Sequence, residues 1–384
     1  MKVVVACDKY KGNIPAMEIC NIIKSAILDT DREIEVVLKP MADGGEGTVE
    51  TMVESRRGRY ITIPVKGPLG EDIQARFGII DKHTAVIEMA AASGIALIDK
   101  DHLNPMETTT YGTGQLIREA LERGCSKIII GIGGSATTDG GMGMAQAMGV
   151  KFYSPQGEEL GWGGKQLKNI EKIDMGGLHP QIGKVKIEVA CDVDNPLTGK
   201  DGAAYVYSPQ KGADAKMVQE LDQGLQNFAA AVKRDLKIDV DRMKGAGAAG
   251  GLGAGLAAFL GASLKPGTDI ITGAIGLREA IEGSDLVITG EGAMDRQTFY
   301  GKSAYGVARA ADDFKVPVAT INGSVLVSRK EVDPDHARLF SGNFSTVNKP
   351  LTLEQAIAQG RELAYDTARE LINFYLSIYN NMKP

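Results

Sequence analysis

The chain has 384 residues, of which 43% are hydrophobic and 24% are charged, and its formal net charge is −6. This composition is typical of a globular protein, and the length favours two domains over one. The acidic balance argues against a nucleic-acid or membrane-surface partner. Four cysteines without CxxC spacing and four histidines without metal-ligand spacing indicate reduced thiols and no His- or Cys-based metal centre. The N-terminus is charged too early for a signal peptide, and no apolar run approaches the ~20 residues of a membrane span, so we expect a cytoplasmic protein.

Strand and helix patterns alternate at the start of the chain. Lys2–Ala6 predicts a strand, and the amphipathic run Ala16–Leu28 predicts a helix. Glu35–Lys39 predicts a second strand, and Thr48–Ser55 opens another helix. This alternation is typical of parallel strands that are joined by helical crossovers.

The pattern changes between Tyr60 and Met89, where three strand-like runs are separated by turn sequences. We interpret this stretch as an antiparallel meander and as the entry into a second domain, although Tyr60–Val65 fits either domain. The later predicted elements, in chain order, are a helix at Gln115–Arg123, the strand KIII, a strand at Ile187–Ala190, a helix at Lys216–Lys233, strands at Asp285–Thr289, Pro317–Ile321 and Ala337–Phe340, and helix within Leu353–Tyr379.

The return of strand–helix alternation near Asp285 gives the simplest architecture. We predict an α/β fold in which both chain ends, 1–65 and 285–384, form a Rossmann-like doubly wound domain. Residues 66–284 then form a second α/β domain that is inserted into the first.

Carboxylates follow five of the predicted strands, and three of these segments are glycine-rich. Ligands of open α/β sheets bind at the carboxyl ends of the strands. Carboxylates beside loops with free backbone N–H groups suit a divalent metal and phosphate oxygens. One such loop alone is typical of an ordinary turn, but five together favour a ligand site. The segments are Cys7–Gly12, Pro40–Gly47, Gly131–Gly143, Cys191–Pro196 and Gly290–Asp295.

Six of the thirteen residues in GIGGSATTDGGMG (Gly131–Gly143) are glycine. We expect these glycines to let backbone amides approach an anion, while the hydroxyl groups add hydrogen-bond donors. In this interpretation Asp139 faces a metal or a water molecule bound to it.

Two familiar phosphate-binding patterns match only weakly. GxGxx[GA] fits Gly131–Ala136, but no helix opens at once, and GxGxxG at Gly245–Gly250 does not follow a strand. The second run therefore predicts either close helix packing or a loop. The Walker A pattern fails because Arg296 stands where its first glycine belongs. A NAD-dependent oxidoreductase of a small hydroxy acid and a two-domain small-acid binding protein remain the alternative functions.

Five segments together resemble the type 1 glycerate kinases of bacteria, and the resemblance extends from Met1 to about Glu370. It implies ATP-dependent phosphorylation of D-glycerate and two α/β domains, one inserted in the other. It also favours 2-phosphoglycerate over 3-phosphoglycerate as the product. The oligomeric state does not follow from it. The segments are MADGGEGT (Met41–Thr48), IEMAAASGIALI (Ile87–Ile98), GGSATTDGGMG (Gly133–Gly143), GAGAAGGLGAGL (Gly245–Leu256) and VITGEG (Val287–Gly292) with Asp295.

Three positions depart from the family pattern. Cys7-Asp8-Lys9 replaces a Pro-Asp-Ser type sequence, Thr138 replaces an asparagine, and Ala293 replaces an arginine. The last change removes a cation from a loop expected to bind phosphate, unless Lys9 or Arg296 compensates.

Phosphoryl transfer requires positioning, neutralisation of phosphate charge and a carboxylate that accepts the hydroxyl proton. The position of each loop suggests a role for its residues. We assign Gly133, Gly134, Ser135 and Glu291 to ATP, Lys11 and Lys302 to the transferring phosphoryl group, Asp139 and Asp295 to Mg²⁺, Asp192 as the base with Asp43 as second candidate, and Asp8, Thr109 and Asn195 to D-glycerate.

Overall fold

The computed structural model describes residues 1–42 and 44–382. The chain divides into two compact units, each with its own hydrophobic core. Unit 1 comprises Met1–Asp43, Glu54–Arg56 and Thr268–Pro384, and unit 2 comprises Gly44–Val53 and Arg57–Gly267. These limits differ from the predicted joints near residues 65 and 284, and the predicted domain boundaries stay a prediction.

Unit 1 is built on a five-stranded sheet in which all neighbouring strands are parallel. Counted along the chain within this unit, the strand order is 2-1-3-4-5, which is a common doubly wound order. The strands, in their spatial order, are β15 (Gly342–Ser345), β13 (Val318–Asn322), β11 (Leu286–Gly290), β1 (Lys2–Cys7) and β2 (Glu35–Leu38). This sheet has the α/β character predicted from the alternation of strands and helices.

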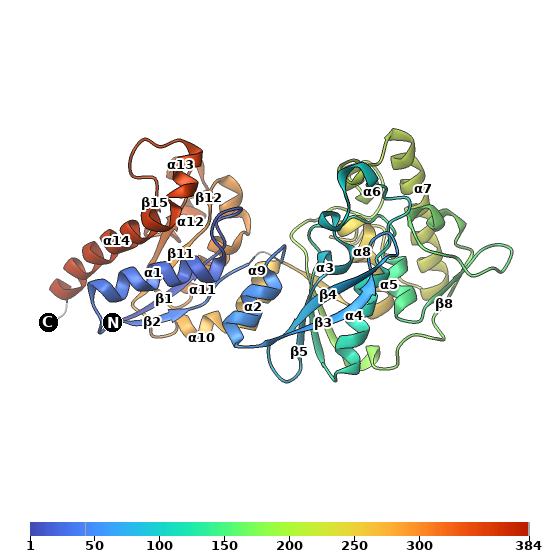
Figure 1. Ribbon diagram of the computed structural model, residues 1–384, viewed down its shortest axis with the longest axis horizontal. Coiled ribbons are helices and arrows are strands. Elements are labelled where there is room, and N and C mark those ends of the chain that lie inside the picture. Colours follow the sequence, from blue (N-terminus) through green and yellow to red (C-terminus); the bar gives the residue numbers. More distant parts are fainter. Residues whose placement is uncertain (43, 383–384) are drawn as a thin grey trace. The chain divides into compact units, whose positions relative to one another are not determined.

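Helices cover both faces of the unit 1 sheet (Figure 1). Val3, Val5 and Cys7 of β1 point to one face and join a core with α1 (Ala16–Thr30) and α14 (Gly360–Met382). Successive strand residues point to opposite faces, so the intervening buried residues of β1 face the other side, where α11 packs. The remaining helices of this part of the chain are α9 (Gly267–Ile275), α10 (Leu277–Ile281), α11 (Ser303–Asp312), α12 (Pro334–Ala337) and α13 (Leu353–Ala358).

One predicted strand of unit 1 is wrong. Ala337–Phe340 was expected to be extended, but α12 ends at Ala337, and the last strand, β15, begins only at Gly342. The Pro334 ring and the Asp333 side chain start a short helix, and this local N-cap chemistry outweighs the apolar residues that follow.

Unit 2 is built on a mixed six-stranded sheet. The antiparallel meander predicted for Tyr60–Met89 is confirmed, because β3, β4 and β5 pair in antiparallel fashion. The neighbouring strands from β5 to β10 are parallel. The strands, in spatial order, are β10 (Ser263–Lys265), β9 (Lys186–Ala190), β6 (Lys127–Gly131), β5 (Thr84–Glu88), β4 (Asp72–Ile79) and β3 (Arg59–Lys66).

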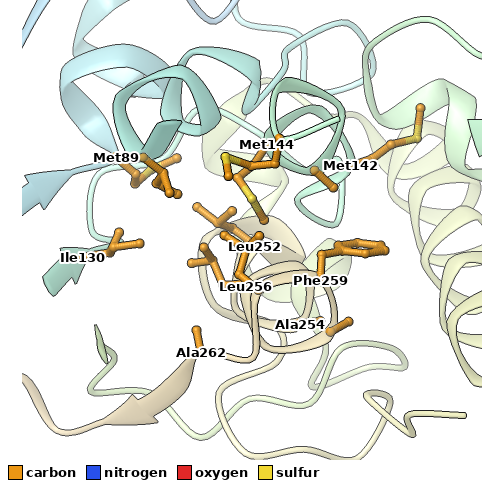
Figure 2. Packing of buried hydrophobic residues seen from close by; sticks show 14 of the residues in the cluster. Met89, Ile130, Met142, Met144, Leu252, Ala254, Leu256, Phe259 and Ala262 are labelled. Atoms are coloured by element: carbon orange, nitrogen blue, oxygen red, sulfur yellow. The ribbon is translucent and has the colours of Figure 1, made fainter. Parts of the chain in front are cut away.

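The helices of unit 2 share one large apolar cluster. Figure 2 shows Met142 and Met144 of one helix in the same cluster as Leu252 and Phe259 of another. The helices are α2 (Thr48–Arg56, whose last three residues belong to unit 1), α3 (Ala90–Ser93), α4 (Tyr111–Glu122), α5 (Met142–Ala147), α6 (Ala203–Tyr207), α7 (Ala215–Leu236) and α8 (Ala248–Leu260). Two further pairs of short strands form small sheets of their own. In unit 2, β7 (Lys151–Tyr153) pairs with β8 (Lys172–Asp174), and in unit 1, β12 (Ala293–Met294) pairs with β14 (Ser324–Val325).

The two glycine-rich runs of unit 2 touch each other backbone to backbone. A Cβ atom on Gly250 would lie 1.9 Å from the Thr137 carbonyl oxygen, and one on Gly255 would lie 2.5 Å from the Gly140 carbonyl oxygen. Gly250 also has a φ of +70°, which side chains disfavour. Of the two interpretations of the run at Gly245–Gly250, the contacts therefore favour close packing of α8 against the loop after β6.

In the described part of the chain, no helix has the length and apolar character needed to cross a membrane. The four cysteines are free thiols, and Cys7, Cys20 and Cys125 are buried.

Candidate active site

In unit 1 the polar residues gather where β1 and β11 end. From β1 the chain adds its next strand, β2, toward one edge of the sheet, whereas from β11 it adds β13 and β15 toward the other edge. The carboxyl ends of the two strands at such a switch point are the usual ligand site of doubly wound sheets. Asp8 follows β1, and Glu291 follows β11. Both residues were assigned to ligands from the sequence, and the fold brings their strand ends side by side through the β1–β11 pairing.

A lysine lies between two carboxylates in this region. Lys302 Nζ is 3.1 Å from Asp295 Oδ1 and 3.5 Å from Glu291 Oε2. Thr298 ties the same group together, because its hydroxyl donates to Glu291 Oε1 at 2.6 Å while its backbone N–H donates to Asp295. The structure thus groups Glu291, Asp295 and Lys302, all three of which were predicted as site residues.

The charges of this cluster perturb one another. Burial lowers the pKa of Lys302, but Glu291 and Asp295 outweigh it and hold the pKa above its ordinary value. Burial raises the pKa of Glu291, whereas for Asp295 the nearby Lys302 outweighs burial and lowers the pKa. Lys302 is therefore a fixed cation, and its side chain remains 33% exposed, so that it can still reach an anion.

Asp8 connects the end of β1 to the start of α11. The Ser303 hydroxyl donates to Asp8 Oδ2 at 2.6 Å, and the Lys9 backbone N–H donates to Asp8 Oδ1. Lys302 occupies the N-cap position of α11 and Ser303 the first turn. Free N–H groups at a helix N-terminus attract anions. Gly301, Lys302 and Ser303 thus stand at the start of a helix, as the glycine, lysine and serine of a Walker A loop do, although the rest of that pattern is absent from the sequence.

Arg296 and Lys9 are the two residues proposed to compensate for the missing arginine at Ala293, and this compensation stays a prediction. The Arg296 guanidinium lies 3.4 Å from Glu331 and is mostly exposed, and Lys9 contributes its backbone N–H to Asp8. The described cation beside Glu291 is Lys302. Lys11 is an exposed residue on the turn after β1, and this turn packs against Gly292.

In unit 2 the loop Gly44–Gly47 lies over the carboxyl ends of β6 and β9. A Cβ atom on Gly44 would lie 2.6 Å from that of Ala190, and one on Gly131 would lie 2.4 Å from the Gly44 carbonyl oxygen. One on Gly133 would lie 3.2 Å from Gly45 Cα. The loop Gly44–Gly47 thus lies beside the start of the loop Gly131–Gly143, and glycine permits their close approach. Asp43, the second candidate base, lies outside the described residues.

Most of the loop Gly131–Gly143 is buried. Gly133 and Gly134 are exposed, and from Ser135 onward the loop is enclosed by the protein. Gly134 has a φ of +72°. Gly133 and Gly134 are the exposed part of the loop, and the anion contact expected there stays a prediction, whereas the threonines behind them face the interior.

Asp139 is fully buried and accepts four hydrogen bonds. Its Oδ2 accepts from the backbone N–H and the hydroxyl of Thr110, both at 2.8 Å, and from the Gly143 N–H. Its Oδ1 accepts from the Gly141 N–H. Burial raises the pKa of this carboxyl, and the donated hydrogen bonds oppose that shift. A carboxylate offers about four lone-pair sites, so this arrangement favours a structural role over the predicted Mg²⁺ contact.

We expect the Asp139→Asn variant to lose stability rather than metal affinity. The new amide NH₂ would face donors, which leaves buried N–H or O–H groups without an acceptor at about 1–3 kcal/mol each. Thermal unfolding should show a clearly lower Tm, while any remaining activity keeps its Mg²⁺ dependence. A variant that unfolds at the wild-type Tm but requires more Mg²⁺ for activity would contradict the structural role and support Asp139 as an Mg²⁺ ligand.

Among the described residues, no group of three or more His, Cys, Asp and Glu side chains is arranged to hold a metal ion. Mg²⁺ is often held by one or two carboxylates together with phosphates of the substrate. Asp295 is 39% exposed and ionised beside Lys302, so a single carboxylate contact of this kind fits it.

Asp192 follows β9 and is exposed. Its Oδ1 accepts a 2.8 Å hydrogen bond from the backbone N–H of Gly267, the first residue of α9. Asn195, in the same loop, uses both ends of its amide: Nδ2 donates to the Asp201 carbonyl and Oδ1 accepts from the Tyr207 hydroxyl. These contacts shape the loop, and they engage the Asn195 groups that were assigned to D-glycerate.

Thr109 is 1% exposed, and its Oγ1 accepts the Tyr111 N–H at the start of α4. This contact favours a structural role over the predicted contact with D-glycerate. The sequence reasoning missed Glu88, which ends β5 beside β6 and accepts the Val49 N–H at 2.8 Å. The sequence signal that could have identified Glu88 is a carboxylate at the end of an apolar, strand-like run.

The same reasoning gave no role to Lys211, although this lysine lies in the loop-like sequence Pro209-Gln210-Lys211-Gly212. In the structure it is 1% exposed and contacts the Gly131–Gly143 loop.

Comparisons with known proteins agree with this architecture. The model of the Glycerate kinase family matches residues 3–376. The chain is 46% identical over 370 residues to the glycerate kinase of Halalkalibacterium halodurans, covering 96% of this chain and 97% of that protein. It is 46% identical over 357 residues to the glycerate 2-kinase of Escherichia coli, covering 93% of each. A crystal structure described as glycerate kinase 2 from Salmonella typhimurium LT2 has a TM-score of 0.91 at 43% identity and covers 99% of both chains.

Two α/β cores, one on a parallel sheet and one on a mixed sheet, with polar groups at their strand ends define the class of an α/β enzyme. The chain belongs to the glycerate kinase family, and the resemblance noted in the sequence is confirmed. It is accordingly a glycerate kinase enzyme that acts on small molecules.

Proposed function

We propose that this enzyme transfers the γ-phosphoryl group of ATP to the 2-hydroxyl of D-glycerate, which yields 2-phosphoglycerate and ADP. The observation that carries the proposal is the 46% identity, over 93% of both chains, to a protein named glycerate 2-kinase. The cation and hydroxyl groups at the strand ends support it, because phosphoryl transfer depends mainly on positioning and on neutralising charge. The cytoplasmic location stays a prediction from the sequence.

In unit 1 we assign Lys302 to the transferring phosphoryl group, with Lys11 as a second, exposed cation. The carboxylates of Glu291 and Asp295 hold the Lys302 ammonium in place. Asp295 is the carboxylate we assign to Mg²⁺, which when bound to the nucleotide would neutralise phosphate charge. We keep Asp8 as a substrate contact, because a carboxylate accepts hydrogen bonds from hydroxyl groups.

In unit 2 we assign the exposed N–H groups of Gly133 and Gly134, with the Ser135 hydroxyl, to the nucleotide phosphates. Asp192 is the base in this proposal. It takes the proton from the 2-hydroxyl as that oxygen bonds to the γ-phosphorus and the bond to ADP breaks. Its exposure leaves room for a substrate hydroxyl.

The nicotinamide alternative finds less support. A dinucleotide fingerprint places its third small residue at the start of a helix, whose N-terminus receives the pyrophosphate. Here α5 begins at Met142, six residues after Ala136, and the stretch between them is buried.

Turnover tests the proposal directly. With D-glycerate and Mg²⁺ the enzyme should release ADP from ATP, and removal of divalent ions with a chelator should abolish this release. NAD⁺ with D-glycerate should give no absorbance of NADH. Hydride transfer without ADP release would contradict the proposed function.

A further inference from the structure

Lys211 is a buried cation beneath the loop that follows β6. It ends the 3₁₀ helix Pro209–Lys211, and 1% of its surface is exposed. Its Nζ donates to Ser135 Oγ at 2.7 Å and to the Thr137 carbonyl oxygen at 2.6 Å. Lysines are almost never fully buried unless they are paired, so burial at this place in the loop demands an explanation.

The chemistry of an ammonium group fixes the direction of the Ser135 hydrogen bond. An ammonium has three donors and no acceptor, so Ser135 Oγ must accept, and its own proton must point elsewhere. Within the described residues, the bond from Lys211 is the one hydrogen bond that this hydroxyl makes. Ser135 is 9% exposed and directly follows the exposed Gly133 and Gly134. Its proton is therefore free to donate at the exposed part of the loop.

We infer that Lys211 is a positioning residue that holds the Ser135 hydroxyl as a hydrogen-bond donor toward an anionic group bound at Gly133–Ser135. The inference rests on the proposed function, which makes this group a phosphate of ATP. Lys211 acts through Ser135, since its own Nζ is enclosed by the protein.

This arrangement is sensitive to protonation. Burial lowers the pKa of Lys211 to about 7, although the charge of Asp139 opposes the shift. The groups that touch Nζ, the Ser135 hydroxyl and the Thr137 carbonyl, are neutral. Above this pH the neutral amine has a lone pair that accepts the Ser135 proton, and the donor toward the ligand is lost. Affinity for ATP should therefore be highest below pH 7 and fall as pH rises through that value.

The test measures KM for ATP between pH 6 and 9 in the wild type, Lys211→Met, Ser135→Ala and the double variant. At pH 6 each single change should raise KM roughly 10- to 100-fold, the loss of a hydrogen bond to a charged group. Both should also remove the rise of KM with pH. The double variant should be no worse than Lys211→Met alone, because the two residues act through one hydrogen bond. Lys330→Met, at an exposed position, is the control that should change nothing.

Other results would overturn the inference. One is a Lys211→Met enzyme that keeps the wild-type pH profile, and another is effects of the two single variants that multiply in the double variant. If Lys211→Met does not fold, a Ser135→Ala enzyme with an unchanged KM for ATP and an unchanged pH profile would overturn the inference instead. A wild type without ATP-dependent turnover would overturn the proposed function as well, whereas normal turnover with these outcomes contradicts this inference alone.

Discussion

The Asp192→Asn variant is expected to lower kcat by ~10²- to 10⁴-fold, the usual contribution of a positioned general base. Asparagine keeps a carbonyl oxygen, so it can still accept the Gly267 N–H that Asp192 Oδ1 accepts at 2.8 Å. The fold of the loop and the KM for ATP should therefore stay close to those of the wild type. Steady-state kinetics together with thermal unfolding measure both effects.

Asp192→Ala is the matched control, because it removes the base and the hydrogen-bond acceptor together. We expect it to lose the same catalytic factor and, in addition, roughly 0.5–2 kcal/mol of stability, comparable to the loss of a helix cap. If Asp192→Asn were fully active and only Asp192→Ala were impaired, Asp192 would be a structural residue at the start of α9. The role of base would then pass to Asp43.

Removal of the Lys302 side chain is expected to cause a second large loss, of at least ~100-fold in kcat. A preorganised cation that neutralises charge in the transition state typically contributes an effect of this size. Lys302 is 33% exposed, and exposed ion pairs contribute about 0–1 kcal/mol, so Lys302→Ala should unfold at nearly the wild-type Tm. Activity and stability thus separate in one variant.

Lys330→Ala provides the comparison for charge alone. Lys330 is exposed and lies in the short 3₁₀ helix Arg329–Glu331. The change removes the same charge without touching Glu291 or Asp295, and kcat should stay within about two-fold of the wild type. Equal, small effects of both substitutions would show that Lys302 is an ordinary surface lysine, and the phosphoryl contact would have to be sought at Lys11.

The fold was largely predictable because its strands are short, β-branched and separated by clear turn or helix patterns. The meander between Tyr60 and Met89 shows this well, since period-2 alternation and turn residues both point to β3, β4 and β5. The strand at Gly342–Ser345 was missed because glycine, asparagine and serine disfavour strands locally. Its place beside β13 depends on tertiary pairing, which one sequence does not display.

The site was predictable in part. The cluster of Glu291, Asp295 and Lys302 follows from one short segment after one strand, so local order in the sequence was enough to nominate it. The burial of individual charged side chains could not be predicted from local sequence in the same way. Asp139 and Lys211 both stand in glycine-rich or proline-rich sequence that resembles exposed loop, yet both are enclosed by unit 2. Their enclosure depends on contacts between distant segments, such as the hydrogen bonds of Lys211 to the loop after β6 and the close contact of α8 with that loop, and one sequence does not display such contacts.

The most direct test of the proposed function is ³¹P NMR of the product formed from D-glycerate and ATP–Mg²⁺. The account predicts that the γ-phosphate resonance of ATP disappears as ADP and a phosphomonoester form in equal amounts. The ester phosphorus should couple to a single proton, because the 2-carbon of glycerate carries one hydrogen. A phosphomonoester coupled to the two hydrogens of the 3-carbon would identify 3-phosphoglycerate and contradict the proposed product, and the absence of any ester would contradict ATP-dependent phosphorylation itself.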